Sequence, residues 1–270
     1  YIKSMIIWLA SYPKSGNTWI RSFLSAYYFT DCGKFDFNLL EQFKQFPSKD
    51  FINDNIKDPG LISNYWVPIQ EKILSNKKIT FLKTHNAYIN LNNTNFTSEK
   101  YTLGVIYILR DPRNLITSLK NHSDISYDEA FNFMANEDTV LYDKRFNDFD
   151  TAHFISSWSL HLKSWYNEKK IRKIFIKYED VENNTYGVFK RIVEFVNNLK
   201  DDKNSIDEEK MLKAIETTTF SNLQKKEENG EFQENVYSFK RDKKIKFFNL
   251  GKKNKWQEIL PESVKIKINK

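Results

Sequence analysis

A short apolar run, a loop and a helical pattern near the start of the chain constrain the fold more than any other feature. Residues 5–10 form a strand-sized run that is wholly apolar, as expected of a buried strand. After Trp19, apolar side chains recur at helical spacing through Tyr28, so we expect a helix that packs on this strand. The loop between them combines turn formers with helix-start residues, namely Pro13, Lys14, Ser15, Gly16, Asn17 and Thr18.

This loop is predicted to bind a phosphate-like anion. A turn that enters a helix N-terminus directs free N–H groups and the positive end of the helix dipole at a ligand. Lys14 adds a charge, and Ser15 and Thr18 add hydroxyl groups. The pattern is not a Walker A loop, in which Lys follows the second Gly, because Lys14 precedes Gly16 by two residues. The alternative is an ordinary strand–turn–helix with a surface lysine.

Strand-like and helical segments alternate along the rest of the chain. This alternation predicts an α/β fold with a central parallel sheet flanked by helices, in a single domain over residues 1–270, of which 1–4 are expected to be a cloning remnant. Ser126 with Glu129 and Ser205 with Glu208 form capping-box patterns at helix starts. The other predicted strands are 79–83, 105–109 and 173–178, and the predicted helices are 112–122, 151–169, 185–199 and 206–216, with short helices and loops over 34–78.

Chemically useful side chains follow several of these strands. Ligands of parallel sheets bind beyond the carboxyl ends of the strands, so we expect Lys14, His85, Arg110 and Tyr178 along one edge. His85 can act as a general base, since an unperturbed imidazole has a pKa near neutrality. A lone His is more often a hydrogen-bonded structural residue, and that alternative stays open at this point.

Arg110 carries a second prediction. Its planar guanidinium suits a phosphate, and Ser118 lies two turns into the helix that follows. The competing interpretation is that Arg110 pairs with a nearby acid such as Asp111 and that Ser118 only packs.

Composition excludes several classes of protein. With 40% hydrophobic and 16% aromatic residues the chain should be globular. The longest apolar runs are strand-sized, which argues against a transmembrane helix, and the strand beginning at Met5 leaves no room for a signal peptide. The lone Cys32 excludes an internal disulfide and a Cys-based zinc site. We therefore expect a cytoplasmic protein that does not use a metal.

The net charge of +7 is concentrated near the C-terminus. Residues 240–270 hold eleven Lys or Arg against three acids, a net of +8. Such a basic segment is usually a solvated face or a nucleic-acid patch, and it could equally be the wall of a site for a polyanionic small molecule.

Taken together, these motifs resemble the sulfotransferases that use 3′-phosphoadenosine 5′-phosphosulfate (PAPS) and release 3′-phosphoadenosine 5′-phosphate (PAP). The resemblance rests on Pro-Lys-Ser-Gly-x-Thr-Trp at 13–19, Lys-Thr-His at 83–85, Arg110 with Ser118, and Tyr-Glu-Asp at 178–180. Thr-Thr-Phe at 218–220 is similar to a Thr-Ser-Phe of that family, and Trp158, His161 and Trp165 match a helix motif that we interpret mainly as core. The resemblance covers residues 5–256.

The resemblance implies a mechanism and a set of binding residues. His85 would be the catalytic base, Lys14 would stabilise the leaving phosphate, and Lys83 would hold the acceptor or the transferring group. No metal is implied, and the acceptor would be a small molecule with a hydroxyl or amine group. The residues implied to bind the nucleotide are Lys14, Ser15, Gly16, Asn17, Thr18, Trp19, Arg110, Ser118, Tyr178, Thr218 and Phe220, together with Asn249, Leu250, Gly251 and Lys252 of a C-terminal motif.

That C-terminal motif departs from the family pattern Arg-Lys-Gly-x-x-Gly-x-Trp. Asn249 and Leu250 stand where the pattern has Arg and Lys, and Asn254 stands in place of the second Gly. Asn is the best non-glycine residue for a left-handed conformation, so we expect the turn to survive at Asn254. We also expect a nearby lysine, Lys252 first and then Lys246, to replace the missing Arg.

The acceptor is the least determined part of the site. Segments 34–75, 123–150 and 225–248 are predicted to form the pocket rim. Their aromatic residues would suit an apolar or aromatic alcohol, although core aromatics would give the same pattern, and a glycan or an amine stays open. A homodimer is possible, and neither nucleic acid nor membrane is expected as a partner. The aromatic residues are Phe35, Phe37, Phe43, Tyr65, Trp66, Tyr88, Phe131 and Phe146.

Two alternatives stand beside this prediction. A P-loop nucleotide kinase should show Gly-Lys-Ser/Thr, which is absent. A non-catalytic protein would use the basic segment to bind nucleic acid or a sulfated glycan, and its most plausible form is a degenerate sulfotransferase that binds nucleotide without turnover.

Overall fold

The computed structural model describes residues 4–269 except 77, 144–148, 235 and 239–241. Its helices are α1 (Asn17–Phe29), α2 (Ser63–Leu74), α3 (Pro112–Ser123), α4 (Tyr127–Ala135), α5 (Trp158–Asn167), α6 (Tyr178–Asn183), α7 (Thr185–Lys200), α8 (Glu208–Thr217), α9 (Phe220–Glu228), α10 (Trp256–Ile259) and α11 (Glu262–Ile268), with 3₁₀ turns η1 (Phe37–Gln42), η2 (Pro59–Ile62) and η3 (Gly251–Lys253). Its strands are β1 (Ile6–Ser11), β2 (Lys44–Gln45), β3 (Thr80–Thr84), β4 (Asn90–Leu91), β5 (Thr94–Asn95), β6 (Thr102–Leu109), β7 (Val140–Leu141), β8 (His153–Phe154), β9 (Lys173–Lys177), β10 (Val236–Ser238) and β11 (Lys243–Ile245).

A five-stranded parallel sheet lies at the centre, in the order β2-β3-β1-β6-β9. From β1 the chain goes to β3 on one side and then crosses to β6 on the other. The order therefore reverses at β1, and a ligand crevice is expected beyond the carboxyl end of that strand. This sheet confirms the predicted α/β class and each of the four strands expected from the sequence.

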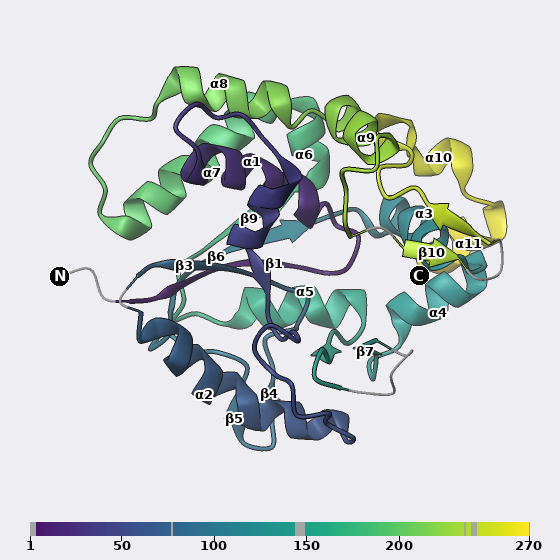
Figure 1. The fold of residues 1–270 in the computed structure, drawn as a ribbon. Coiled ribbons are helices and arrows are strands. Elements are labelled where there is room, and N and C mark those ends of the chain that lie inside the picture. The colour runs from purple at the N-terminus through teal and green to yellow at the C-terminus, as the bar shows by residue number, and fades with distance from the viewer. Residues whose placement is uncertain (1–3, 77, 144–148, 235, 239–241, 270) are drawn as a thin grey trace.

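The strands bury both faces, because alternate residues point to opposite sides. In β1, Ile7 and Leu9 join a core beneath α1, α7 and α8, while Ile6 and Trp8 join a second core on the other face. Figure 1 shows α1, α6, α7 and α8 above the sheet and α2 and α5 below it. Both faces are thus covered, as a central run of apolar residues requires.

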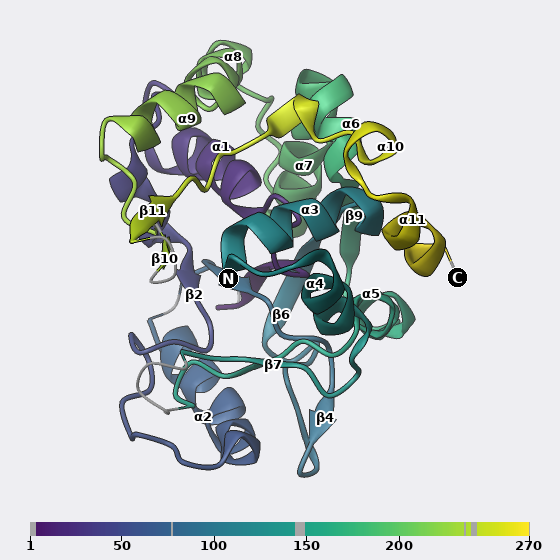
Figure 2. The same cartoon turned by 90° about the vertical axis from the view of Figure 1, so that its right-hand side faces the viewer.

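The C-terminal part of the chain lies over the carboxyl edge of the sheet. Figure 2 shows the segment that follows α9 passing beside α3, with α10 and α11 at the far end. Helix α11 packs on α3 and α4. In the part of the chain that is described, no helix has both the length and the apolar character needed to cross a membrane.

Two helix starts differ from the prediction. The helix expected over 151–169 begins only at Trp158, because His153 and Phe154 pair with β7 and Ser157 then caps the helix. The capping box expected at Ser205 is not used; Asp207 accepts the Lys210 N–H instead and starts α8. The box at Ser126 and Glu129 forms as predicted.

Candidate active site

Four predicted site residues meet at the carboxyl edge of the sheet. Lys14, His85, Arg110 and Tyr178 each follow a different strand, and all four line one cavity of about 530 Å³. The parallel order of β3, β1, β6 and β9 brings them together, because their carboxyl ends point the same way.

The loop after β1 has the strained geometry of a close-contact site. Gly16 has φ +98°, and a Cβ built there would lie 2.3 Å from the ring of Tyr178, so this position needs glycine. Lys14 also has a positive φ, of 67°. The loop therefore has little freedom, and α1 begins directly at Asn17.

The loop, the start of α1 and Arg110 contain buried polar atoms that the folded chain leaves unpaired. Ser15 Oγ, Asn17 Oδ1, Trp19 Nε1 and Arg110 Nε are buried, and none has a hydrogen-bond partner among the described residues. Such groups are costly to bury, and they are satisfied if a polar ligand binds. Ser15 itself does not line the cavity, whereas Asn17, Thr18 and Trp19 do.

Arg110 is held for contact with a ligand. Its Nη1 donates to the Lys14 carbonyl at 3.0 Å, and its guanidinium lies 4.2 Å from the centre of the Tyr178 ring. The acid that sequence reasoning considered as its partner, Asp111, instead pairs with Arg113 at 2.7 Å. Ser118 lines the same cavity from α3.

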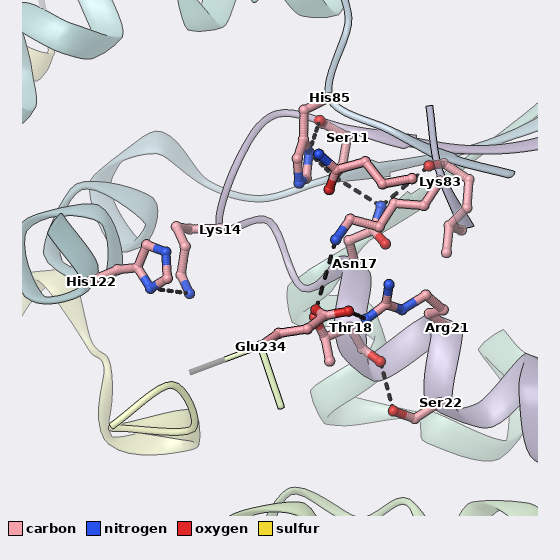
Figure 3. Close-up of polar contacts among 12 residues, drawn as sticks. Ser11, Lys14, Asn17, Thr18, Arg21, Ser22, Lys83, His85, His122 and Glu234 are labelled. Carbon is pink, nitrogen blue, oxygen red and sulfur yellow. Dashed lines mark hydrogen bonds and ion pairs between the residues drawn. The ribbon is translucent and has the colours of Figure 1, made fainter. Parts of the chain in front are cut away.

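Lys14 points toward α3. Its Nζ lies 3.2 Å from His122 Nδ1 and 3.5 Å from the centre of the Phe247 ring (Figure 3). Burial, and then repulsion from Arg110 and Lys83, lowers the pKa of Lys14 to about 7. Burial likewise lowers the pKa of His122 to about 3, so the imidazole is neutral and accepts a hydrogen bond from the lysine. His122 is a site residue that sequence reasoning missed.

His85 has a defined tautomer. Its Nδ1 lies 2.8 Å from the Ser11 carbonyl, which can only accept, so Nδ1 carries the proton and Nε2 keeps a lone pair. Burial lowers the pKa of His85 well below its usual value, which keeps the ring neutral. His161 Nε2 binds the His85 carbonyl at 3.0 Å, and its Nδ1 binds the Tyr107 hydroxyl at 2.8 Å. As interpreted from the sequence, His161 is buried support.

A charged cluster beside His85 was not expected. Glu234 pairs through one carboxylate oxygen with Arg21 and through the other with Lys83 Nζ at 3.8 Å (Figure 3). Burial, and then repulsion from Arg21, lowers the pKa of Lys83 to about 8. Burial opposes ionisation of Glu234, yet Lys83 and Arg21 hold its pKa at about 2. The position of Arg21, one turn after Thr18, was a signal in the sequence; Glu234 gave none.

The C-terminal motif contributes to the cavity in part. Asn249, Leu250 and Gly251 line it, whereas Lys252 is exposed and lies outside the lining. Lys246 lines the cavity and pairs with Glu228 at 2.8 Å.

Asn254 corrects the expected turn. Its φ is −79°, so it does not take the left-handed conformation; Gly251 takes it instead, with φ +52°. Asn254 uses its side chain, which donates to the Asn114 carbonyl at 2.8 Å and ties the segment to α3.

Of the two nucleotide-binding residues predicted from the Thr-Thr-Phe motif, one lines the cavity and the other does not. Phe220 lines it, and a Cβ on Gly251 would lie 2.8 Å from that ring. Thr218 is fully buried, and its hydroxyl donates to the Ala214 carbonyl at 2.6 Å, away from the cavity. The sequence could not show that this hydroxyl would donate its hydrogen bond to a carbonyl in the last turn of α8.

The expected aromatic pocket rim is wrong for most of its members. Of those residues only Phe43 lines the cavity; Phe35, Phe37 and Trp66 are buried in the cores, and Phe146 lies outside the described residues. The three rim segments themselves do contribute to the lining, with polar and apolar side chains in similar proportion. The polar ones are Glu41, Lys44, Gln45, Ser48, Asp50, Ser123, Glu234 and Lys246, and the apolar ones are Leu40, Phe43, Phe133, Leu141, Val236, Phe247 and Phe248.

Metal binding has no visible basis in the described part of the chain, where no three His, Cys, Asp or Glu side chains gather as ligands.

Comparison with known proteins identifies the family. A family model described as a sulfotransferase domain matches residues 5–270. The chain belongs to the sulfotransferase family. Cytosolic sulfotransferase 12 of Arabidopsis thaliana is 25% identical, and the similarity covers 99% of this chain and 76% of that protein. Sulfotransferase 1A1 of Rattus norvegicus is 24% identical over 80% of this chain, which spans only 65% of that relative's length.

Solved structures share the fold of this sulfotransferase. Mouse sulfotransferase SULT7A1 complexed with PAP matches with a TM-score of 0.57 and 18% identity, over 98% of this chain and 82% of that chain. Retinol dehydratase in a complex with retinol and PAP matches with a TM-score of 0.62 and 16% identity, over 100% of this chain and 80% of that chain. The family match leaves the kinase alternative without support.

Proposed function

We propose that this sulfotransferase moves a sulfuryl group from PAPS to a hydroxyl or amine of a small-molecule acceptor, with His85 as general base and without a metal. The observation that carries the proposal is the imidazole of His85. Its Nδ1 proton is committed to the Ser11 carbonyl at 2.8 Å, so Nε2 is the nitrogen that can take a proton. A neutral base beside the anion loop is what proton removal from an acceptor requires.

PAPS fits the unpaired groups of the site. Arg110 Nε and Trp19 Nε1 are buried donors in need of acceptors, and the N-terminus of α1 favours an anion. When bound, PAPS would supply the activated sulfuryl group and the 3′-phosphate that distinguishes it from ATP. The residues proposed to hold it are Lys14, Ser15, Gly16, Asn17, Thr18, Trp19, Arg110, Ser118, Tyr178, Phe220, Asn249, Leu250 and Gly251; Thr218 and Lys252 are proposed from the resemblance alone.

Lys14 and Lys83 are assigned complementary roles. Lys14 belongs to the loop proposed to bind the donor, and it would stabilise negative charge that develops on the leaving phosphate. Lys83, whose charge acts on His85, would hold the acceptor or the group in transit. Structural relatives that carry PAP, retinol or androsterone support a small-molecule acceptor.

The domain organisation, the location and the partners of the protein are also proposed. We infer a single sulfotransferase domain, supported by a family match over residues 5–270, and a location in the cytoplasm, supported by the cytosolic relative. The partners proposed are the small-molecule acceptor and, in a homodimer, a second copy of the chain; neither nucleic acid nor a membrane is proposed.

Titration with PAP and, separately, with ADP tests the nucleotide site. We expect micromolar binding of PAP and binding of ADP at least about tenfold weaker, because ADP offers no 3′-phosphate to Arg110. Arg110→Ala should remove this difference, while Lys255→Ala, an exposed cation outside the cavity, should keep it.

Equal affinity for PAP and ADP in the native protein would refute a 3′-phosphate site. Binding of neither nucleotide would favour the degenerate alternative.

A further inference from the structure

Arg21 and Glu234, which form a charged cluster with Lys83, have no role in the proposed function. Arg21 exposes 3% of its side chain, yet it lines the cavity from α1. Its Nε is buried and finds no hydrogen-bond partner within the described ranges. A buried guanidinium is expensive without an anion, so its position beside the anion loop needs an explanation.

Glu234 is at present the counter-ion of this arginine. The carboxylate comes from the stretch between α9 and β10, and 38% of its side chain is exposed, so it reaches the cluster from the mouth of the cavity. One oxygen binds Arg21, while the other stays 3.8 Å from Lys83, which is longer than a hydrogen bond. The closer contact is the one to Arg21, so an anion that replaces this carboxylate has to bind Arg21 first and Lys83 second.

The position of the cluster suggests which anion that is. Figure 3 shows Glu234 between the side chains of Arg21 and Lys14, with Lys83 and His85 on the β3 side. Its charge acts on Lys14 as well as on its two direct partners. A negative group held here lies against Lys83, two residues before the proposed base, and within electrostatic reach of Lys14 of the anion loop. These are the two lysines proposed to contact the leaving phosphate and the group in transit.

We propose that Arg21 is a further binding residue for the transferring sulfuryl group, and that the Glu234 carboxylate holds this subsite until the donor binds. The inference rests on the proposed function. Arg21 and Lys83 exchange one oxyanion for another, so the cluster never holds two uncompensated buried cations. The carboxylate competes with the sulfuryl group of PAPS for Arg21 and Lys83. PAP has no sulfuryl group, so its binding does not displace the carboxylate.

The test compares dissociation constants for PAPS and PAP, measured by calorimetry without acceptor. In Glu234→Gln we expect the ratio of PAPS to PAP affinity to rise about tenfold, because a charge that competes with the sulfuryl group alone is gone. The effect of the lost charge on Lys14 acts on both nucleotides and cancels in this ratio. Asp50→Asn is the matched control: Asp50 lines the same cavity and pairs with Lys44 at 3.9 Å, and its loss should change neither constant.

A second substitution tests the arginine. In the double variant Arg21→Gln/Glu234→Gln the gain in the ratio of PAPS to PAP affinity should disappear, while retained PAP binding reports that the protein is folded. An unchanged ratio of the PAPS and PAP constants in Glu234→Gln, or weaker PAPS binding, would overturn the inference. A double variant that keeps the gain would remove Arg21 from the subsite. If native protein binds neither nucleotide, the proposed function fails instead.

Discussion

The cavity has two halves that are built in different ways. The half that we propose binds the donor, the donor half, is built on one continuous loop and the start of α1, with Arg110 and Tyr178 packed against it. The half that we propose binds the acceptor, the acceptor half, collects charged side chains from distant segments, as Glu234 shows by pairing with Arg21, 213 positions away in the chain. Local sequence dictates the loop on which the first half is built, whereas only the tertiary fold brings the second half together.

The largest effect is expected at the boundary between the halves. His85→Ala should lower kcat with PAPS and an accepted substrate by at least about 100-fold, because no other neutral base is assigned to the proton. The affinity for PAP should stay within about twofold, since His85 belongs to the acceptor half. Initial rates and calorimetry on the same preparation measure both quantities.

Normal turnover in this variant would remove His85 from the mechanism. A large loss of PAP affinity would instead mean that His85 also contributes to nucleotide binding in the donor half.

An intermediate effect concerns the charge of Lys14 in the donor half. Its pKa of about 7 in the free protein should rise when an anion binds, so binding above pH 7 takes up a proton. Affinity for PAP should therefore weaken with increasing pH above about 7, by at most about tenfold per pH unit. Calorimetry at pH 8 in buffers of different ionisation enthalpy measures the proton uptake directly.

Lys14→Gln supplies the control for this prediction. The substitution should reduce the proton uptake between pH 7 and 9 to the part that Lys83, with its pKa of about 8, contributes. Uptake that is unchanged in the variant would show that another group titrates.

The smallest effects are expected where the donor half meets the C-terminal segment. Lys246→Ala should weaken PAP binding by about twofold to fivefold, because an exposed cation contributes little. Lys252→Ala should have a smaller effect, because Lys252 lies outside the cavity lining. Titration of both variants with PAP ranks them, and if neither changes the constant, no lysine replaces the missing Arg.

The same division explains what the sequence could predict. The strands that precede the four strand-end residues could be predicted, because a short apolar run is a local sequence signal for a buried strand. These residues are Lys14, His85, Arg110 and Tyr178. The parallel arrangement then placed these residues at one edge. A helix start could be predicted where the sequence shows a capping residue directly before the helix, as at Ser126. The prediction failed at Ser205 because Asp207, two positions later, competes for the same role.

The acceptor half could not be predicted for a physical reason. Phe37 and Trp66 are apolar whether they pack a core or line a pocket, and burial is decided by the elements that cover them. Glu234 follows α9 in a stretch without a regular pattern, so nothing near it in the sequence indicated that it would reach Arg21. Lys246 and Lys252 are both basic neighbours of the motif, and only the fold distinguishes them.

The steric contact at Gly16 makes the anion loop a poor candidate for transplantation. A side chain at this position would collide with the ring of Tyr178, and the same ring lies 4.2 Å from the Arg110 guanidinium. Residues 13–19, moved into another strand–helix junction, would retain the backbone turn. They would lose the ring of Tyr178, against which the turn packs, and the guanidinium of Arg110, which lies over that ring. A protein engineer would have to transfer three strand ends together.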